Sequence, residues 1–425
     1  MKICVIGLGY VGLPLFLQLG KSFKVHGYDY DANRVNELKR GFDKNNSINK
    51  AKVKIKNNLI SDKLSTLKEF NVYIITLPTP VNKKNQPDIK NIINITTKLS
   101  KIIKNNDLVI YESTFYPGLT EEILIPILEK DSNLNCKFNN TKHIKQFSVG
   151  YSPERVNPGD KNKNIQNIKK IISATNNQAL IKMNRIYSSF VKVGLYKTSN
   201  IKTAEASKVI ENIQRDLNIA LMNEFSTIFN KMDINTSEVI EAASTKWNFV
   251  KFEPGFVGGH CIGIDPYYLA YKAKRIGIKP KIILQGRYLN ESMAKYASKM
   301  IIKRSHEANI NFDLSKVLIM GFSFKENCND IRNSKIFDIY KQLKKSFNYI
   351  DVFDPLVDLK DIKKMYDINM LNRPPKMKYD IIIVAVKHEI FRKNSFKKLR
   401  INTKKKYLLF DLKKTYPHLK SDFSL

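Results

Sequence analysis

The chain has 425 residues, 43% of them hydrophobic and 10% aromatic, which is enough for two or three domains with buried cores and excludes a largely disordered protein. No apolar run is long enough to span a bilayer, and the N-terminal apolar run lacks a signal-peptide cleavage site, so it predicts a strand. The net charge of +34 comes from lysines spread among Asn and Ile along the whole chain, which disfavours a nucleic-acid-binding surface. Four widely separated cysteines disfavour a disulfide framework and predict a reducing, cytoplasmic location.

The first segment, residues 1–198, alternates short apolar runs with helix-like stretches. This alternation predicts a parallel sheet with crossover helices. The candidate strands are KICVIG (2–7), FKVHGYD (23–29), NVYIITLPTP (71–80), DLVIYEST (107–114) and KQFSVGYSP (145–153).

The middle segment, residues 199–308, is predicted to be helical and to contain a loop around a lone cysteine. Residues 200–231 have no Gly or Pro and carry apolar side chains at helical spacing, so they predict one helix of roughly 40 Å that can bridge two domains. Residues 309–425 return to strand-like runs separated by helical stretches, which predicts a second doubly wound α/β domain. These runs are KVLIMGFSF (316–324), YIDVFDP (349–355), DIIIVAVK (380–387) and KYLLFDLKK (406–414).

The stretch GLGYVG at 7–12 is a G-x-G-x-x-G motif between a candidate strand and an apolar helix start. Gly7 permits a tight turn, Gly9 lets the backbone approach a pyrophosphate, and Gly12 lets helix and strand pack closely. The second strand ends at Asp29, at the spacing where an acid binds the adenosine ribose, so NAD is expected over NADP, although Arg34 stands nearby. The predicted cofactor site comprises Gly7, Gly9, Tyr10, Val11, Gly12, Asp29, Arg34, Thr79 and Thr114.

Polar residues follow three further candidate strands, in TLPTP (76–80), ESTFYPG (112–118) and YSPERVNPGD (151–160). They place Thr79, Thr114, Glu154 and Arg155 at the carboxyl edge of the sheet, where open α/β sheets bind ligands. Taken singly, each of these residues is also typical of an ordinary turn. Their occurrence on one edge beside a dinucleotide motif favours a site.

Two polar residues of the predicted long helix, Lys208 and Asn212, are four positions apart and therefore share a face. Such a pair is usually solvated. Here the pair lies opposite much of the apolar face, which permits a site without establishing one.

The loop GFVGGHCIGIDPYY (255–268) contains Cys261. By local sequence alone, a buried packing residue and a nucleophile are equally supported. A metal site is disfavoured because His260 and Cys261 lack further ligands at suitable spacing, and His260 is expected to be neither ligand nor base. For a nucleophile, the glycines would give a substrate room and Asp265 would supply an acceptor nearby.

Together these motifs resemble the UDP-sugar 6-dehydrogenase family, which includes the UDP-glucose and UDP-N-acetylmannosamine dehydrogenases, and most closely its UDP-N-acetylhexosamine branch. The resemblance implies an N-terminal NAD-binding Rossmann domain, a central helical dimerisation region in a homodimer, and a C-terminal UDP-sugar-binding α/β domain. The similar stretches are GLGYVGLPL, LPTP, ESTFYPGLTEE, GYSPERVNPGD, AEASKVIENIQRDLNIALMNE, STKWNF, PGFVGGHCIGIDPYYL, GRYLN and GFSFKENCNDIRNSK.

The resemblance also implies a reaction. The family oxidises the primary alcohol at C6 of a UDP-sugar to a carboxylate with two NAD and without a metal, and the branch acts in bacterial surface polysaccharide synthesis. Cys261 would attack the intermediate aldehyde to give a thiohemiacetal, whose oxidation leaves a thioester for water to hydrolyse. The substrate would be UDP-GlcNAc or UDP-GalNAc, which the sequence does not distinguish.

Roles for individual residues follow from the resemblance, position by position. Lys208, with Asn212 beside it, would stabilise the developing oxyanion. Asp265 would act in proton transfer, Glu154 in thioester hydrolysis, and Thr114 would hold the water or the nicotinamide side of the pocket. The implied substrate-binding residues are Glu154, Arg155, Lys208, Asn212, Arg287, Gly258, Lys325 and Arg332. The lysines of DLKK (411–414), Lys413 and Lys414, match the place where relatives have a basic residue near the uridine.

One departure separates the chain from the UDP-glucose branch, which carries a second carboxylate where this chain has Pro158. The alternatives are a UDP-glucose 6-dehydrogenase, a two-electron NAD-dependent hydroxyacid-type dehydrogenase, which needs no cysteine, and a basic nucleic-acid-binding protein. The partners expected are a UDP-N-acetylhexosamine and a second copy of the chain, with no nucleic acid and no membrane.

Overall fold

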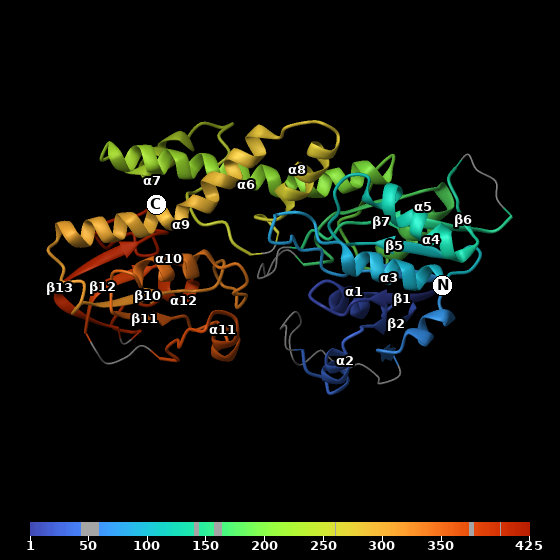
Figure 1. The fold of residues 1–425 in the computed structure, drawn as a ribbon, viewed down its shortest axis with the longest axis horizontal. Coiled ribbons are helices and arrows are strands. Elements are labelled where there is room, and N and C mark those ends of the chain that lie inside the picture. Colours follow the sequence, from blue (N-terminus) through green and yellow to red (C-terminus); the bar gives the residue numbers. More distant parts are fainter. Residues whose placement is uncertain (44–58, 140–143, 157–163, 260, 374–377, 400) are drawn as a thin grey trace. The chain divides into compact units, whose positions relative to one another are not determined.

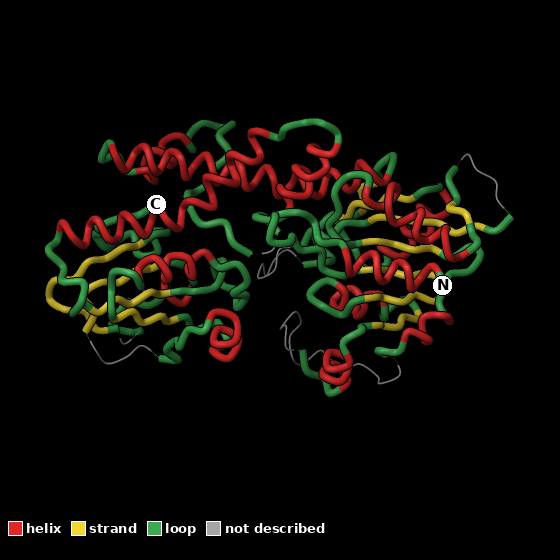
Figure 2. The backbone as a smooth tube through the Cα atoms, in the orientation of Figure 1, coloured by secondary structure: helices red, strands yellow, loops and turns green. Residues whose placement is uncertain are grey.

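The computed structural model describes residues 1–43, 59–139, 144–156, 164–259, 261–373, 378–399 and 401–425 (Figure 1). The chain divides into two compact units, one of residues 1–211 and 267–279, the other of residues 212–266 and 280–425. Both contain a sheet, and in both the strands alternate with helices along the chain (Figure 2).

The first unit is built on a nine-stranded sheet, whose main path has the order β3-β2-β1-β4-β5-β7-β8-β9, with β6 paired to β7. β1 pairs in parallel with β2 and β4, β4 with β5, and β5 with β7, whereas β8 runs antiparallel to β7. The strands are β1 (Lys2–Ile6), β2 (Lys24–Tyr28), β3 (Ile60–Ser61), β4 (Val72–Ile75), β5 (Leu108–Tyr111), β6 (Asn135–Cys136), β7 (Gln146–Tyr151), β8 (Lys170–Ala174) and β9 (Leu195–Lys197).

Helices connect these strands. They are α1 (Gly12–Leu19), α2 (Ala32–Lys39), α3 (Lys90–Ser100), α4 (Ile125–Ser132) and α5 (Asn177–Ser188), with a 3-10 helix η3 (Leu64–Glu69) and a π-helical turn η4 (Thr120–Leu124). Ile3 and Val5 of β1 point into one apolar cluster with α1 and α5 residues, whereas Cys4 and Ile6 are buried on the opposite face. Both faces of the sheet are therefore covered, as expected for a doubly wound domain.

The second unit contains a four-stranded parallel sheet of order β11-β10-β12-β13. Val317 and Ile319 of β10 join one apolar cluster, and the alternate residues Leu318 and Met320 join another, so this sheet is also buried on both faces. Its elements are β10 (Lys316–Met320), α10 (Lys335–Leu343), β11 (Tyr349–Phe353), α11 (Leu359–Tyr366), β12 (Lys378–Val384), α12 (Glu389–Arg392) and β13 (Asn402–Asp411).

Helices dominate the middle of the chain, as predicted. The longest, α6 (Ile201–Lys231), begins in the first unit and ends in the second, and it is followed by α7 (Thr236–Ala243), α8 (Asp265–Arg275) and α9 (Lys281–Glu307). Cys261 lies between α7 and α8, and residues 265–268 of the predicted cysteine loop form the first turn of α8.

The predicted α/β fold with two doubly wound sheets is confirmed, and each predicted strand corresponds to a strand of the structure. The sequence did not predict β3, β6, β8 and β9, which are short or lie beyond β7, where the sheet becomes antiparallel. The division at residues 198 and 308 stays a prediction.

The two sheets share a local device at the end of their first strand. In the first unit the N–H of Leu8 donates to the Asp29 carboxylate at 2.8 Å, and in the second the N–H of Phe322 donates to Asp354 at 2.7 Å. Gly7 and Gly321 stand in the left-handed region at φ +93° and +89°, where a side chain would be strained. Each unit thus ends its first strand in a glycine turn held by an aspartate from the neighbouring strand.

Candidate active site

The glycine turn of the first unit has the local geometry that the sequence predicts. A Cβ on Gly12 would collide with the carbonyl of Gly7, so only glycine lets α1 start this close to the turn. A Cβ on Gly9 would meet nothing within 4 Å, which leaves this stretch of backbone open to a ligand. Tyr10 is exposed and Val11 immediately precedes α1. These residues could hold the pyrophosphate of a dinucleotide at a helix N-terminus.

The side chains of Asp29 and Arg34 both form hydrogen bonds with the backbone of Leu8 in this turn. Asp29 accepts hydrogen bonds from the N–H groups of Leu8 and Asp31, at 2.8 and 3.1 Å. The buried Arg34 donates to the Leu8 carbonyl at 2.9 Å and forms ion pairs of 2.8 Å with Glu37 and Asp43. The predicted contacts of Asp29 and Arg34 with a cofactor stay predictions, and the structure adds a structural role for each.

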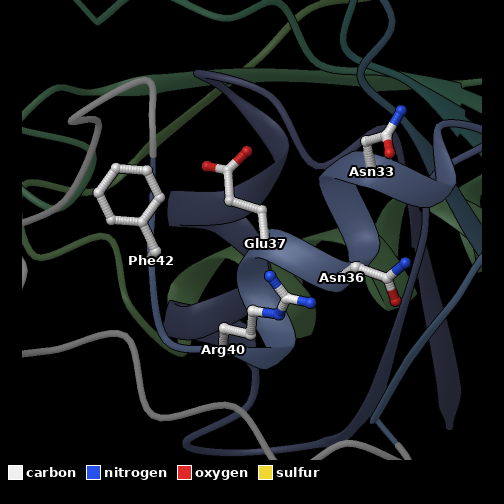
Figure 3. A pocket seen from close by; sticks show the side chains of 5 residues that line it. All are labelled: Asn33, Asn36, Glu37, Arg40 and Phe42. Atoms are coloured by element: carbon white, nitrogen blue, oxygen red, sulfur yellow. The ribbon is translucent and has the colours of Figure 1, made fainter.

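A surface hollow of about 420 Å³ lies on the outer side of α2 (Figure 3). It contains none of the predicted site residues, and its lining is polar apart from one phenylalanine. The lining residues are Asn33, Asn36, Glu37, Arg40 and Phe42. Four of the predicted site residues lie instead at the carboxyl ends of the strands: Thr79, Thr114, Glu154 and Arg155.

The structure brings the predicted strand-end residues Thr79 and Thr114 together. They follow the neighbouring strands β4 and β5, and the Thr79 hydroxyl donates to the Thr114 carbonyl at 2.9 Å. The Tyr268 hydroxyl donates to the Thr79 carbonyl at 2.7 Å. On the other side of β4, the Thr76 hydroxyl donates to the Gly7 carbonyl at 2.8 Å and so joins this edge to the glycine turn.

Glu154 and Arg155 follow β7, the next strand along the same edge. The Glu154 carboxylate accepts from the N–H groups of Arg155, at 2.8 Å, and Val156, which fixes the turn. Arg155 donates to the carbonyl of Lys169 at 2.6 Å and pairs with Glu211 of α6 at 2.7 Å. Pro158, the departure from the UDP-glucose branch, lies outside the described residues.

The sequence did not predict a buried ionisable cluster at this edge of the sheet, formed by Glu112, Lys170 and Tyr187. Glu112, the first residue after β5, pairs with Lys170 at 2.8 Å and accepts from the Tyr187 hydroxyl at 2.6 Å. Burial raises the pKa of Glu112, against the lowering effect of Lys170. The only sequence signal was its place at the start of ESTFYPG.

Glu205 of α6 is a second residue that the sequence reasoning missed. Its buried carboxylate accepts from the N–H of Gly118 at 2.6 Å and from the N–H and hydroxyl of Thr120 at 3.0 and 2.6 Å. Burial raises the pKa of this carboxyl to about 7, although these hydrogen bonds lower it. Glu205 thus attaches α6, one turn before Lys208, to the segment that follows Thr114.

Lys208 and Asn212 are both buried on α6, so the pair is not a solvated one. Asn212 donates to the carboxylate of Asp265 at 2.5 Å, and the N–H of Asp265 donates to the Cys261 carbonyl at 2.9 Å. The structure therefore joins three of the predicted catalytic residues, Asn212, Asp265 and Cys261, through consecutive hydrogen bonds.

Cys261 differs from the other three cysteines. It is partly exposed, whereas Cys4, Cys136 and Cys328 are buried, and burial raises the pKa of each of these thiols, that of Cys136 to about 12. The thiolate is the nucleophilic form, so these three are inert. The nucleophilic role of Cys261 stays a prediction, which its partial exposure favours. His260 lies outside the described residues.

The glycines before Cys261 pack against the second sheet domain. Gly259 stands at φ +77°, and a Cβ there would lie 2.7 Å from the Phe324 ring; one on Gly258 would lie 2.7 Å from the Asn333 carbonyl. Phe324 precedes Lys325, whose ammonium lies 5.6 Å from the centre of that ring. The cysteine loop therefore lies beside the turn after β10.

The remaining predicted substrate residues have protein partners. Arg332 pairs with Asp330 at 2.6 Å and is partly exposed. Arg287 is buried and pairs with Asp216 at 2.6 Å and with Glu291. Lys413, predicted from the resemblance to lie near the uridine, donates to the carbonyl of Pro254 at 2.8 Å, and burial lowers its pKa.

In the described ranges, no three His, Cys, Asp or Glu side chains gather as metal ligands would. None of the helices there combines the length and apolar character that a bilayer crossing requires.

A glycine turn suited to a dinucleotide, joined by a long helix to a second doubly wound sheet, is typical of two-domain NAD-dependent dehydrogenases. The chain belongs to the UDP-glucose/GDP-mannose dehydrogenase family: its residues 1–191 match the NAD binding domain of that family, 202–292 the central domain, and 318–418 the UDP binding domain.

Relatives match over nearly the whole chain. The chain is 46% identical to a UDP-N-acetyl-D-glucosamine 6-dehydrogenase of Salmonella typhi, covering 100% of this chain and 99% of the relative. It is 43% identical to Protein CapL of Staphylococcus aureus, covering 97% and 95%. Among solved structures, UDP-D-ManNAc dehydrogenase from Pyrococcus horikoshii has a TM-score of 0.82 at 28% identity, covering 96% of this chain and 94% of that one.

Proposed function

We propose that the protein is an NAD-dependent 6-dehydrogenase of a UDP-N-acetylhexosamine, UDP-GlcNAc or UDP-GalNAc, that makes the uronic acid through a thioester on Cys261. The observation that carries this proposal is the partly exposed Cys261 in a glycine-lined loop, joined through Asp265 to Asn212. The S. typhi relative, named for this activity, is similar over its whole length. By the family resemblance, the product serves bacterial surface polysaccharide synthesis.

The proposed chemistry has two oxidations. NAD, when bound, accepts the hydride in each, so one sugar consumes two NAD and one water and yields a carboxylate, two NADH and three protons. Between the oxidations the Cys261 thiolate adds to the C6 aldehyde, because an aldehyde carbon donates hydride readily only after it becomes tetrahedral. Hydrolysis of the resulting thioester frees the thiol, and no step uses a metal.

The side chains of the protein stabilise charge, transfer protons and bind the substrate. Lys208 and Asn212 stabilise the oxyanion of the tetrahedral species, Asp265 moves a proton, and Glu154 assists the attack of water on the thioester. Thr114 holds the water or the nicotinamide side. The proposed contacts to the UDP-sugar are Arg155, Gly258, Arg287, Lys325 and Arg332, with Lys413 near the uridine.

NADH stoichiometry tests this proposal. Each UDP-sugar in limiting amount is incubated with excess NAD, and NADH absorbance and products are measured for UDP-GlcNAc, UDP-GalNAc, UDP-ManNAc and UDP-glucose. We expect two NADH per UDP-GlcNAc or UDP-GalNAc and a uronic acid product. One NADH per sugar with free aldehyde would identify a two-electron enzyme, and exclusive use of UDP-glucose would place the protein in the other branch.

We further propose a homodimer, located in the cytoplasm, where the Cys261 thiol stays reduced. In the second unit, α6 exposes Leu221 and Ile228, at 43% and 47%, one heptad apart on one face, and α9 exposes Ile282 at 76%. Exposed apolar side chains one heptad apart on a helix are typical of a helix–helix interface, and a second copy of the chain is the partner proposed.

Sedimentation velocity tests the dimer. The unmodified protein is expected to sediment as a species of twice the chain mass. The double variant Leu221→Glu/Ile228→Glu should sediment as a monomer, because burying two charges in the interface opposes association. The control Leu314→Glu changes an apolar side chain that is 72% exposed but lies outside these helices, and should remain dimeric. A monomeric parent, or a dimeric double variant, would refute this surface.

A further inference from the structure

The start of the cysteine loop is held by a buried amide on α6. Asn223, which has no exposed surface, donates to the carbonyl of Gly255 at 2.9 Å and accepts from the N–H of the same residue at 2.7 Å. One side chain thus satisfies both backbone groups of Gly255, as a neighbouring strand would. Because both groups are buried, removing the amide leaves a donor and an acceptor without partners.

This contact is the end of a longer chain of buried hydrogen bonds. Asn223 also donates to the side-chain oxygen of Asn290 on α9 at 2.9 Å. Asn290 donates to the backbone carbonyl and the carboxylate of Asp216, at 2.9 and 2.7 Å, and Asp216 pairs with Arg287 at 2.6 Å. All four side chains are buried, so a group that moved would lose its partner with no water to replace it.

The other end of the network reaches the far side of the same loop. A Cβ on Gly263 would lie 3.5 Å from the Arg287 guanidinium, so this arginine packs directly against the loop two residues after Cys261. Between the two ends, Asn333 donates to the Gly259 carbonyl at 2.9 Å. Cys261 lies between these contacts.

We propose that the chain Asn223–Asn290–Asp216–Arg287 is the device that positions Cys261, since it holds Gly255 before the cysteine and Gly263 after it. This inference rests on the proposed nucleophilic role of Cys261. Asn223, Asn290 and Asp216 act only through the loop, whereas Arg287, which is also a proposed contact to the UDP-sugar, packs against the loop at Gly263. A misplacement of about 1 Å at a reacting group costs about a hundredfold in rate.

Two single variants and their combination test the network. Asn223→Ala and Asn290→Ala are each expected to lower kcat about ten- to hundredfold with little change in the KM for NAD. The double variant should lose about as much kcat as the more impaired single variant, because both substitutions interrupt the same chain of hydrogen bonds. Alkylation of Cys261 by iodoacetamide, followed by mass spectrometry from pH 6 to 10, should give a rate profile that differs from the parent's, because the thiol is no longer held in one environment.

Asn230→Ala is the matched control, because Asn230 is on the same helix but bonds to Ser226 and Ser424 instead of the loop. It should match the parent in kcat and in alkylation. If Asn223→Ala does not fold, Asn290→Ala still tests the idea, since it leaves Gly255 bonded to Asn223. Folded variants with the parent's alkylation profile overturn the proposal, whatever their activity. If the parent oxidises no UDP-sugar, the proposed function is refuted instead. Alkylation would then still test whether the network positions Cys261, because it does not depend on turnover.

Discussion

Replacement of Cys261 by Ser is expected to lower formation of the uronic acid by on the order of a thousandfold or more, since loss of a catalytic nucleophile has effects of at least this size. A serine hydroxyl is hardly ionised near neutral pH, whereas a thiol is partly thiolate and intrinsically nucleophilic. Without the adduct the aldehyde stays a poor hydride donor. The variant should therefore form at most one NADH per sugar.

The measurement follows product by mass spectrometry and NADH by absorbance, with the parent in parallel. Cys136→Ala is the control, because its thiol is buried, burial raises its pKa to about 12, and Cys136 is not among the predicted site residues. The control should retain turnover. Two NADH per sugar and parental turnover from Cys261→Ser would mean that the thiol is not the nucleophile.

Lys208→Ala is expected to lower kcat about 100- to 1,000-fold, the cost of removing one oxyanion-stabilising donor. Lys208 is buried one turn before Asn212 on α6, so its ammonium acts where water screens little. The KM for the UDP-sugar should change much less than kcat, since the interaction forms as charge develops. Added methylamine should restore part of the activity, because it returns an ammonium to the vacated space.

Lys202→Ala is the matched control for this prediction. Lys202 lies on the same helix, but its side chain is half exposed and 3.4 Å from the carboxylate of Glu121, a surface pair worth little. Its kcat should stay within about twofold of the parent. A Lys208→Ala enzyme with near-parental kcat, or one whose loss lies wholly in KM, would assign Lys208 to substrate binding alone.

The sequence could predict those parts of the site whose backbone conformation or packing depends on a few consecutive residues. The left-handed turn at Gly7 and the close packing at Gly12 follow from a few consecutive residues, and both occur in the structure. Thr79 and Thr114 are 35 residues apart, yet they meet because they follow neighbouring parallel strands. A general rule about sheet edges was enough to place them together.

The residues that the sequence reasoning missed act through distant partners. Glu205 bonds to Gly118, 87 residues away, and Asn223 bonds to Gly255, 32 residues away. In sequence each is a polar residue inside a long helix, where an exposed position is the usual interpretation. Nothing local distinguishes them from the other polar side chains of α6, because their function depends on what packs against that face.

By itself, then, the sequence determined the two doubly wound sheets, the long helix and the residues of the strand ends, since periodicity, glycine and chain direction are local properties. Only the tertiary structure decided that Cys261 is a partly exposed thiol while three others are buried, and that Asn212, Asp265 and the Cys261 carbonyl are joined. Exposure and hydrogen-bond partners depend on which distant segments cover a residue, and packing alone fixes that.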